Sequence, residues 1–203
     1  MFHQKTGNSC VLVQGNICMG NPRIGIAVGF QERDIHLSGN LCVDNACNLS
    51  ISGMDCSSRG DTCRGENYSR FARSHRPYGA RFGGTNTLVA NLSVSGDRLA
   101  LVEVMGENLN WIGGSIRGTR ASADNVGIRL GTSESFNATT RPPARITIRG
   151  VDVAGCHAGL SLHGRMEDVV IAQNSFWEND CAVNRAPDAE GRMVIEHNTG
   201  IGV

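Results

Sequence analysis

Lysine and aromatic residues are scarce in this chain of 203 residues, and its sequence contains no long apolar run. Lys5 is the only lysine beside 18 arginines, and only ten residues are aromatic, whereas glycine occurs 26 times and asparagine 17 times. A transmembrane helix needs roughly 18 consecutive apolar residues, and a signal peptide needs a basic start followed by an apolar core. Neither pattern is found. The net charge is zero, so the field of the whole molecule does not favour nucleic acid or an anionic membrane as a partner.

Short segments repeat at a nearly constant spacing towards both ends of the chain. The runs that begin at Ile146, Val169 and Met193 recur with a period of about 24 residues, the signature of stacked structural repeats. VLVQGNICM from Val11 precedes IHLSGNLCV from Ile35 by the same step. The runs are short, rich in β-branched residues and bounded by glycine or asparagine, so they indicate strands rather than helices.

Each repeat predicts three short strands separated by turns. The third strands are expected at 24–28 and 48–51, and in the second repeat Ile35 and Leu37 are expected to face the core. Asparagines recur at matching turns, where the amide of one repeat can hydrogen-bond to the amides of its neighbours and form a ladder. These asparagines are Asn16, Asn40, Asn174 and Asn198.

The segments GIAVGFQERDIHLSGN at 25–40 and GLSLHGRMEDVVIAQN at 159–174 share one pattern, in which a β run, a polar turn and a second β run end in asparagine. This pattern resembles the right-handed parallel β-helix superfamily, which includes pectate lyases, polygalacturonases, alginate epimerases and phage tailspikes. The resemblance implies an all-β chain, folded over 1–203 as one right-handed parallel β-helix (a solenoid) of about seven coils. Similarity to tailspikes, which are trimers, implies a homo-oligomer in an extracellular or virion-surface location.

Two segments interrupt the repeat and are expected to be loop insertions. Residues 57–86 have almost no aliphatic side chains, and residues 131–143 contain two adjacent prolines. Structureless loops of this length are uncommon in compact domains and are usually functional or disordered. The first insertion holds six arginines against Asp61 and Glu66, together with four of the ten aromatic residues. It is therefore the strongest functional signal in the sequence.

Arginine interleaved with aromatic residues suits an acidic polysaccharide as the ligand. A guanidinium group binds a carboxylate in a bidentate fork, and an aromatic ring packs on the apolar face of a sugar. The residues predicted to bind such a substrate are Arg64, Tyr68, Arg70, Phe71, Arg73, Arg81 and Trp177. The alternative is a solvated loop whose rings pack on the repeats. Nucleic acid is not expected, because the rest of the surface is not basic.

The sequence leaves open whether the protein is an enzyme. A polysaccharide lyase needs a base that removes the C5 proton of a uronic acid and a cation that stabilises the resulting enolate. His75, Arg76 and Tyr78 in the first insertion match these roles by residue type alone. An ordinary surface role is the alternative for all three.

A glycoside hydrolase instead needs two carboxyl groups on either side of the scissile bond. Asp152, on the second strand of one repeat, is expected to neighbour Glu178 or Asp180 on the next repeat, beside Trp177 as a platform for a sugar. The alternative is a set of solvated turn carboxylates. The polygalacturonase motifs NTD, DD, GHG and RIK are absent, which disfavours a pectin hydrolase.

The eight cysteines do not have the spacing of a zinc site. Cys18 and Cys42 each follow a Gly-Asn pair at the same offset, so we expect their thiols to stack at equivalent inward positions. Cys47, Cys56 and Cys63 lie in or near the first insertion, where a disulfide is possible. No metal and no cofactor are predicted.

Neither end of the repeat carries an amphipathic helix that would cover its outermost strands, and uncovered strands invite pairing with other chains. We therefore expect a homo-oligomer, neighbouring domains, or a longer chain of which this sequence is a part. The leading hypothesis is a carbohydrate-directed protein, tailspike-like or lyase-like. The alternative is a non-catalytic structural or adhesive module that docks partner chains through its open ends.

Overall fold

The computed structural model describes residues 7–65, 78–97, 99–119, 125–131 and 142–200. Within these ranges the chain forms strands and no helix, which confirms the all-β prediction. The strands are β1 (Ser9–Gln14), β2 (Ile17–Met19), β3 (Ile24–Val28), β4 (Arg33–Ser38), β5 (Leu41–Val43), β6 (Cys47–Ile51), β7 (Ser57–Arg59), β8 (Thr62–Gly65), β9 (Tyr78–Phe82), β10 (Thr85–Gly96), β11 (Ala100–Val104), β12 (Glu107–Gly118), β13 (Val126–Leu130), β14 (Ala144–Ala154), β15 (Ala158–Leu162), β16 (Arg165–Ala172), β17 (Ser175–Trp177), β18 (Cys181–Arg185) and β19 (Glu190–Glu196).

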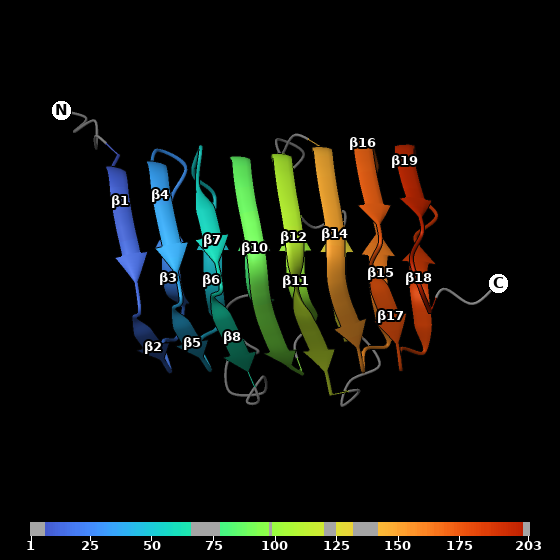
Figure 1. The fold of residues 1–203 in the computed structure, drawn as a ribbon, viewed down its shortest axis with the longest axis horizontal. Helices are drawn as coiled ribbons and strands as arrows, with labels where there is room; N and C mark the ends of the chain where they lie inside the picture. Colours follow the sequence, from blue (N-terminus) through green and yellow to red (C-terminus); the bar gives the residue numbers. More distant parts are fainter. Residues whose placement is uncertain (1–6, 66–77, 98, 120–124, 132–141, 201–203) are drawn as a thin grey trace.

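The strands form two sheets in which every pairing between named strands is parallel. The larger sheet has 12 strands with the path β1-β4-β7-β10-β12-β14-β16-β19, and the short strands β2, β5, β8 and β17 extend it. The smaller sheet has seven strands in the order β18-β15-β13-β11-β9-β6-β3. Figure 1 shows the two sheets as layers, with the chain advancing one strand position at a time from β1 to β19. This topology is compatible with a parallel β-solenoid.

The pairing register reproduces the sequence repeat. Val11 pairs with Ile35 and Val169 pairs with Met193, which are the partners that the period predicts. The number of residues between paired positions is larger at two places, where Ser57 pairs with Leu88 and where Leu109 pairs with Ile146. Most of the extra residues fall within the two segments that were predicted to interrupt the repeat, and a few lie between β12 and β13, outside both segments.

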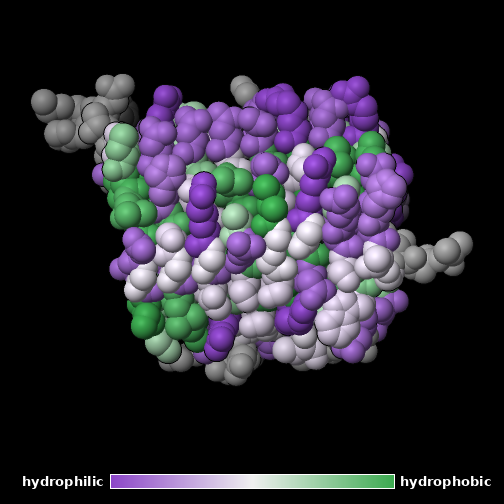
Figure 2. Space-filling view, in the orientation of Figure 1, coloured by the Kyte–Doolittle hydropathy of each residue, from purple (hydrophilic) through white to green (hydrophobic). Residues whose placement is uncertain are grey.

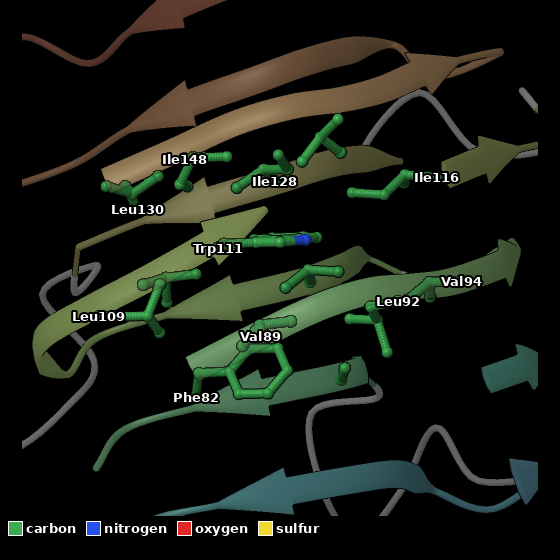
Figure 3. Close-up of a cluster of buried hydrophobic side chains, with 14 of the residues drawn as sticks. Phe82, Val89, Leu92, Val94, Leu109, Trp111, Ile116, Ile128, Leu130 and Ile148 are labelled. Carbon is green, nitrogen blue, oxygen red and sulfur yellow. The ribbon is translucent and has the colours of Figure 1, made fainter. Parts of the chain in front are cut away.

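Alternating side chains fill the space between the sheets and make the core. On β12, Leu109, Trp111 and Ile116 are at most 2% exposed, and Trp111 is fully buried. Its ring centroid lies 6.2 Å from that of Phe82 on the opposite sheet, and its indole N–H donates to the carbonyl of Gly113 at 2.9 Å. Figure 3 shows these residues in one continuous apolar cluster between the two layers. Aliphatic side chains in successive strands therefore stack on one another along the sheet.

The expected asparagine ladders are confirmed, and they satisfy buried polar groups where the long strands bend. The backbone N–H of Asn16 donates to Oδ1 of Asn40 at 3.0 Å, and Nδ2 of Asn40 donates to Oδ1 of Asp61 at 2.8 Å. At the other end, the backbone N–H of Asn174 donates to Oδ1 of Asn198 at 2.8 Å. A buried polar side chain without such partners would destabilise the fold, so each ladder fixes the bend in its strands.

The prediction of a structureless loop over 57–86 was wrong for the part that the structure describes. Ser57–Arg59, Thr62–Gly65 and Tyr78–Phe82 are the strands β7, β8 and β9. The core positions of these strands are filled by Ser58, by Cys63 and by Tyr78, Ala80 and Phe82 instead of large aliphatic residues, and the Ser58 hydroxyl contacts Oδ2 of Asp61 at 2.6 Å. Of the second expected insertion, 131–143, only residues 131, 142 and 143 are described.

The suggested disulfide was also wrong, since the cysteines are free thiols. Cys47 and Cys56 are buried, but their thiols contact the backbone carbonyls of Leu49 and Met54. The stacking of Cys18 and Cys42 is confirmed by their pairing in β2 and β5, and Cys63 in β8 continues the stack.

Candidate functional site

The outward side of the 12-stranded sheet is the most distinctive surface of the described residues. We define the outer face as the four rows of outward-pointing side chains that begin with Leu12, Gln14, Ile17 and Met19 on β1 and β2 and continue through the register of the sheet. Figure 2 shows this face, on which hydrophilic and apolar side chains alternate; at its edge, apolar side chains gather over β1 and again over β2.

The third and fourth rows lie where the long strands end, and both are rich in polar groups. The third row contains Thr62, Ser93, Ser115, Asp152 and Ser175. The fourth row contains Arg64, Ser95, Arg117, Ala154 and Trp177. Hydroxyl groups in adjacent strands are close enough to interact, since Ser93 Oγ lies 3.4 Å from Ser115 Oγ. The rows therefore present a strip of hydrogen-bonding groups across several strands.

The outer face is positively charged although the whole chain is neutral. Its four rows contain four arginines, namely Arg59, Arg64, Arg117 and Arg149. Only two carboxylates accompany them: Asp152 and Glu196. Asp152 is paired with Arg117, and Oε2 of Glu196, the last residue of β19, lies 3.9 Å from Nε2 of His197. Three exposed arginines on the outer face thus have no carboxylate partner within the described part of the chain.

Arg117, Asp152 and Trp177 form one cluster across the neighbouring strands β12, β14 and β17. Oδ2 of Asp152 accepts from Nη2 of Arg117, and Oδ1 of the same carboxylate accepts from the indole N–H of Trp177. Nη1 of Arg117 also donates to the carbonyl of Asp152 at 3.0 Å, and the guanidinium carbon lies 5.0 Å from the centroid of the Trp177 ring. The Trp177 ring is thus held by both its N–H and one cation contact while the residue stays 42% exposed.

This cluster suits binding better than acid–base catalysis. Both oxygens of Asp152 accept hydrogen bonds, one from Arg117 and one from Trp177, which orient the carboxylate towards these two side chains, while each oxygen keeps a further lone pair. The cluster instead fixes an exposed indole, which saves the entropy of ordering it when a ligand arrives. Asp152 is therefore best described as the residue that positions Trp177 and Arg117.

The structure brings three predicted site residues, Asp152, Trp177 and Arg64, to the outer face. The other two members of the hydrolase set are placed differently. Glu178 lies in the turn after β17 with φ of 54°, and Asp180 pairs with His157, whose Nδ1 is 3.1 Å from Oδ2. Asp152 is engaged by Arg117 and Trp177. The hydrolase pair thus stays a prediction without geometric support.

The lyase set falls mainly outside the described residues. His75 and Arg76 lie there, as do the predicted substrate-binding residues Tyr68, Arg70, Phe71 and Arg73. Tyr78 is described and lies on β9 with 3% of its surface exposed, packed in a small cluster with Cys47, Ala100, Val126 and Ala158. A base needs access to its substrate, so this burial does not favour a catalytic role for Tyr78.

Arg81 lies on the other sheet, in an ion pair with a buried carboxylate. Its Nε is 3.2 Å from Oε2 of Glu103, which is 1% exposed. Arg81 also lines a cavity of about 440 Å³ with Phe30, Met105 and the backbone of neighbouring glycines. In the same sheet, burial and, to a smaller extent, the charge of Arg129 lower the pKa of His163, whose ring contacts the hydroxyl of Ser161 at 2.8 Å. Glu103 thus neutralises the positive charge of Arg81, whereas Arg59, Arg64 and Arg149 on the outer face have no carboxylate partner among the described residues.

Sequence reasoning missed Arg59, Arg117 and Arg149. Arg59 falls in a predicted loop, and the other two occur in strands that the sequence identifies only by their apolar period. Their alignment needs the exact register across the two interruptions, where the step between paired strands is longer than elsewhere. An outward arginine at the same position in separate repeats is the signal that could have identified them.

Comparisons of the chain with family models, with curated proteins and with solved structures gave no match. The described residues include no helix that is long and apolar enough to cross a membrane. In the same ranges, no three histidine, cysteine, aspartate or glutamate side chains come together as metal ligands. The geometry of the outer face therefore carries the functional argument alone.

Proposed function

We propose that this protein is a parallel β-solenoid of the pectate-lyase-like or tailspike-like type, and that its outer face binds an acidic polysaccharide. The observation that carries the proposal is the Arg117–Asp152–Trp177 cluster, an exposed indole held in place on a face that also carries Arg59, Arg64 and Arg149, which have no carboxylate partner among the described residues. The chemistry of the face fits the ligand, because arginine recognises carboxylates or sulfates and an indole packs on the apolar side of a sugar ring.

The solenoid interpretation is supported by three features of the fold. Strands in consecutive repeats pair in parallel, as Leu37 does with Ser58 and Ile148 with Ile171. The chain visits the larger and the smaller sheet in turn, so each sheet grows by successive repeats. The asparagine ladders join successive repeats towards both ends of the sheet, as Asn40 joins its two neighbours and Asn174 bonds to Asn198.

The spacing of the fourth row suits an extended polymer. Arg64, Arg117 and Trp177 lie on β8, β12 and β17, with one strand between each consecutive pair. Adjacent strands are about 4.8 Å apart, so these side chains recur roughly every 10 Å across the sheet. The serine and threonine hydroxyls of the third row run beside them and can bond sugar hydroxyls. A chain of sugars running across the strands would contact these groups in succession.

The first experiment compares the affinity of the wild-type protein for uronate-containing, sulfated and neutral polysaccharides, measured by calorimetry at two salt concentrations. We expect binding of the acidic polymers and none of neutral chains of equal length. Binding should weaken as salt rises, because exposed charge pairs are screened within about 8 Å at physiological ionic strength. Equal affinity for neutral and acidic polymers, or no binding of any polymer, would contradict the proposal.

A depolymerisation assay on the same uronate polymers separates binding from cleavage. We assign any cleavage to the lyase set around His75 and Arg76, because hydrogen bonds from Arg117 and Trp177 give the carboxylate of Asp152 a positioning role. The expected result for the outer face alone is binding without turnover. Cleavage that is lost on Asp152→Asn with binding retained would overturn this division of roles.

A second candidate function is that of a structural module that docks partner chains. The observation in its favour is the apolar surface of the first strands, where Leu12, Ile17 and Met19 are 63 to 68% exposed. Large exposed apolar patches often mark protein interfaces. If the polysaccharide panel is blank and the solution mass exceeds that of one chain, this docking function replaces the first proposal.

A further inference from the structure

Three cysteines stack in the core beneath the first strands of the larger sheet. Cys18 on β2 pairs with Cys42 on β5, and Cys42 pairs in turn with Cys63 on β8. Cys42 and Cys63 are 2% and 1% exposed, whereas Cys18, nearest the edge of the sheet, is half-buried. In the register of the sheet, Cys42 lies directly between the other two cysteines.

The geometry of this stack is compatible with a disulfide. Paired residues of adjacent parallel strands have strand spacings of about 4.8 Å, which falls in the range of roughly 4.4–6.8 Å between the Cα atoms of bridged cysteines. Each cysteine of the stack occupies the same position in its strand, so the three side chains point in the same direction. Their Cβ atoms are then about 4.8 Å apart, slightly more than the roughly 3.5–4.5 Å of bridged cysteines, so a bond between neighbours needs a change of side-chain rotamer and a small approach of the two strands.

We propose that Cys18, Cys42 and Cys63 form an oxidative cross-linking site, in which Cys42 forms a disulfide with Cys18 and exchanges it with Cys63. A peroxide oxidises the accessible thiol of Cys18 to a sulfenic acid and releases water. The Cys42 thiolate then attacks that sulfur, forming the S–S bond and expelling hydroxide, which takes up the proton of Cys42 as a second water. Attack of the Cys63 thiolate on Cys42 moves the bond to Cys42–Cys63 and returns Cys18 to the thiol.

The surroundings favour Cys42 as the central sulfur. Hydrogen bonding from Cys63 lowers the pKa of the Cys42 thiol, whereas its bond to Cys42 and burial raise the pKa of Cys63. Burial also raises the pKa of Cys18. The thiolate is the nucleophile in disulfide formation, and Cys42 can reach a partner on either side. One disulfide always leaves one of the three thiols free.

The cross-link would secure an edge strand that packing holds weakly. β2 is three residues long, and its outward residues Ile17 and Met19 are 68% and 63% exposed. A Cys18–Cys42 bond closes the segment that runs from β2 to β5 into a loop. Closing such a loop restricts the unfolded chain, and we expect Tm to rise by about 5 °C.

The test is disulfide mapping by mass spectrometry after treatment of the folded wild-type protein with hydrogen peroxide, then alkylation in denaturant. We expect peptides linked through Cys18–Cys42, Cys42–Cys63 or both, with the Tm increase reversed by dithiothreitol. Cys42→Ser should abolish both links, while Cys63→Ser should retain Cys18–Cys42 alone. Cys156→Ser is the matched control, because Cys156 is buried between β14 and β15, outside the stack, with its thiol against the carbonyl of Ala154.

Disulfide mapping of the wild-type protein tests the proposed cross-links even if a cysteine variant fails to fold. Full alkylation of Cys42 after treatment, with oxidation confined to the exposed Cys10 and Cys181, would overturn the proposal. Links that join Cys42 to a cysteine outside the stack would overturn it equally, since they require the sheet to open.

Discussion

Replacing Trp177 by alanine is expected to weaken the binding of an acidic polysaccharide by about 30-fold, equivalent to roughly 2 kcal/mol. The indole is the largest exposed ring on the outer face, and Asp152 and Arg117 hold it in one orientation. Removing it deletes the apolar platform and leaves the arginine without its ring contact. The affinity is measured by calorimetry against an oligouronate, with circular dichroism to verify that the fold is retained.

The matched control for Trp177→Ala is Phe30→Ala. Phe30 is 78% exposed and lies in the turn between β3 and β4, away from the outer face, so its loss should change affinity by less than about twofold. Asp152→Ala should weaken binding through Trp177 even though it removes a negative charge from the face. An Asp152→Ala variant that binds the acidic ligand more tightly would show that charge, rather than the position of the ring, controls affinity.

Replacing Trp111 by alanine is expected to reduce the free energy of unfolding by about 3–5 kcal/mol, the largest loss of stability for a single core position. Trp111 is fully buried between the two sheets, and its N–H donates to the carbonyl of Gly113. The substitution leaves a cavity beside Phe82 and an unpaired carbonyl at the bend. The measurement is chemical denaturation followed by circular dichroism.

Ile112→Ala serves as the matched control, because Ile112 is the next residue of β12 and points outward with 50% exposure. Its loss should cost less than about 1 kcal/mol. Similar losses for Trp111→Ala and Ile112→Ala would mean that the two faces of β12 are not distinguished as the structure requires. Comparing the two variants therefore tests which side chains of β12 point into the core and which point towards the outer face.

The sequence predicted much of the fold because the repeat is visible in its apolar residues. Ile35 and Leu37 were expected to face the core and are 4% and 1% exposed, and the third strand at 24–28 has the expected bounds. The prediction failed where inward positions are polar. In β7, Ser58 takes the inward position that Leu37 has in β4, and Asp61, between β7 and β8, continues the asparagine ladder; hydrogen bonds to Asn40 and to each other compensate for their burial.

The candidate site was harder to predict than the fold, because it depends on register. Arg64, Arg117 and Trp177 are far apart in the sequence and meet in one row only when every strand from β8 to β17 is correctly aligned. The interruptions before β10 and β14 change the offset, so a constant period misplaces Arg117. Trp177 and Asp152 could be paired from sequence because a single regular repeat separates their strands.

The central claim is that the outer face of the 12-stranded sheet holds the polysaccharide, and a crystal structure of the protein with a bound oligouronate tests it most directly. The account predicts a sugar chain that crosses the strands along the third and fourth rows, with one ring packed on Trp177 and a carboxylate in contact with Arg64. Sugar bound on the seven-stranded sheet beside Arg81 and Glu103, with the outer face empty, would contradict it.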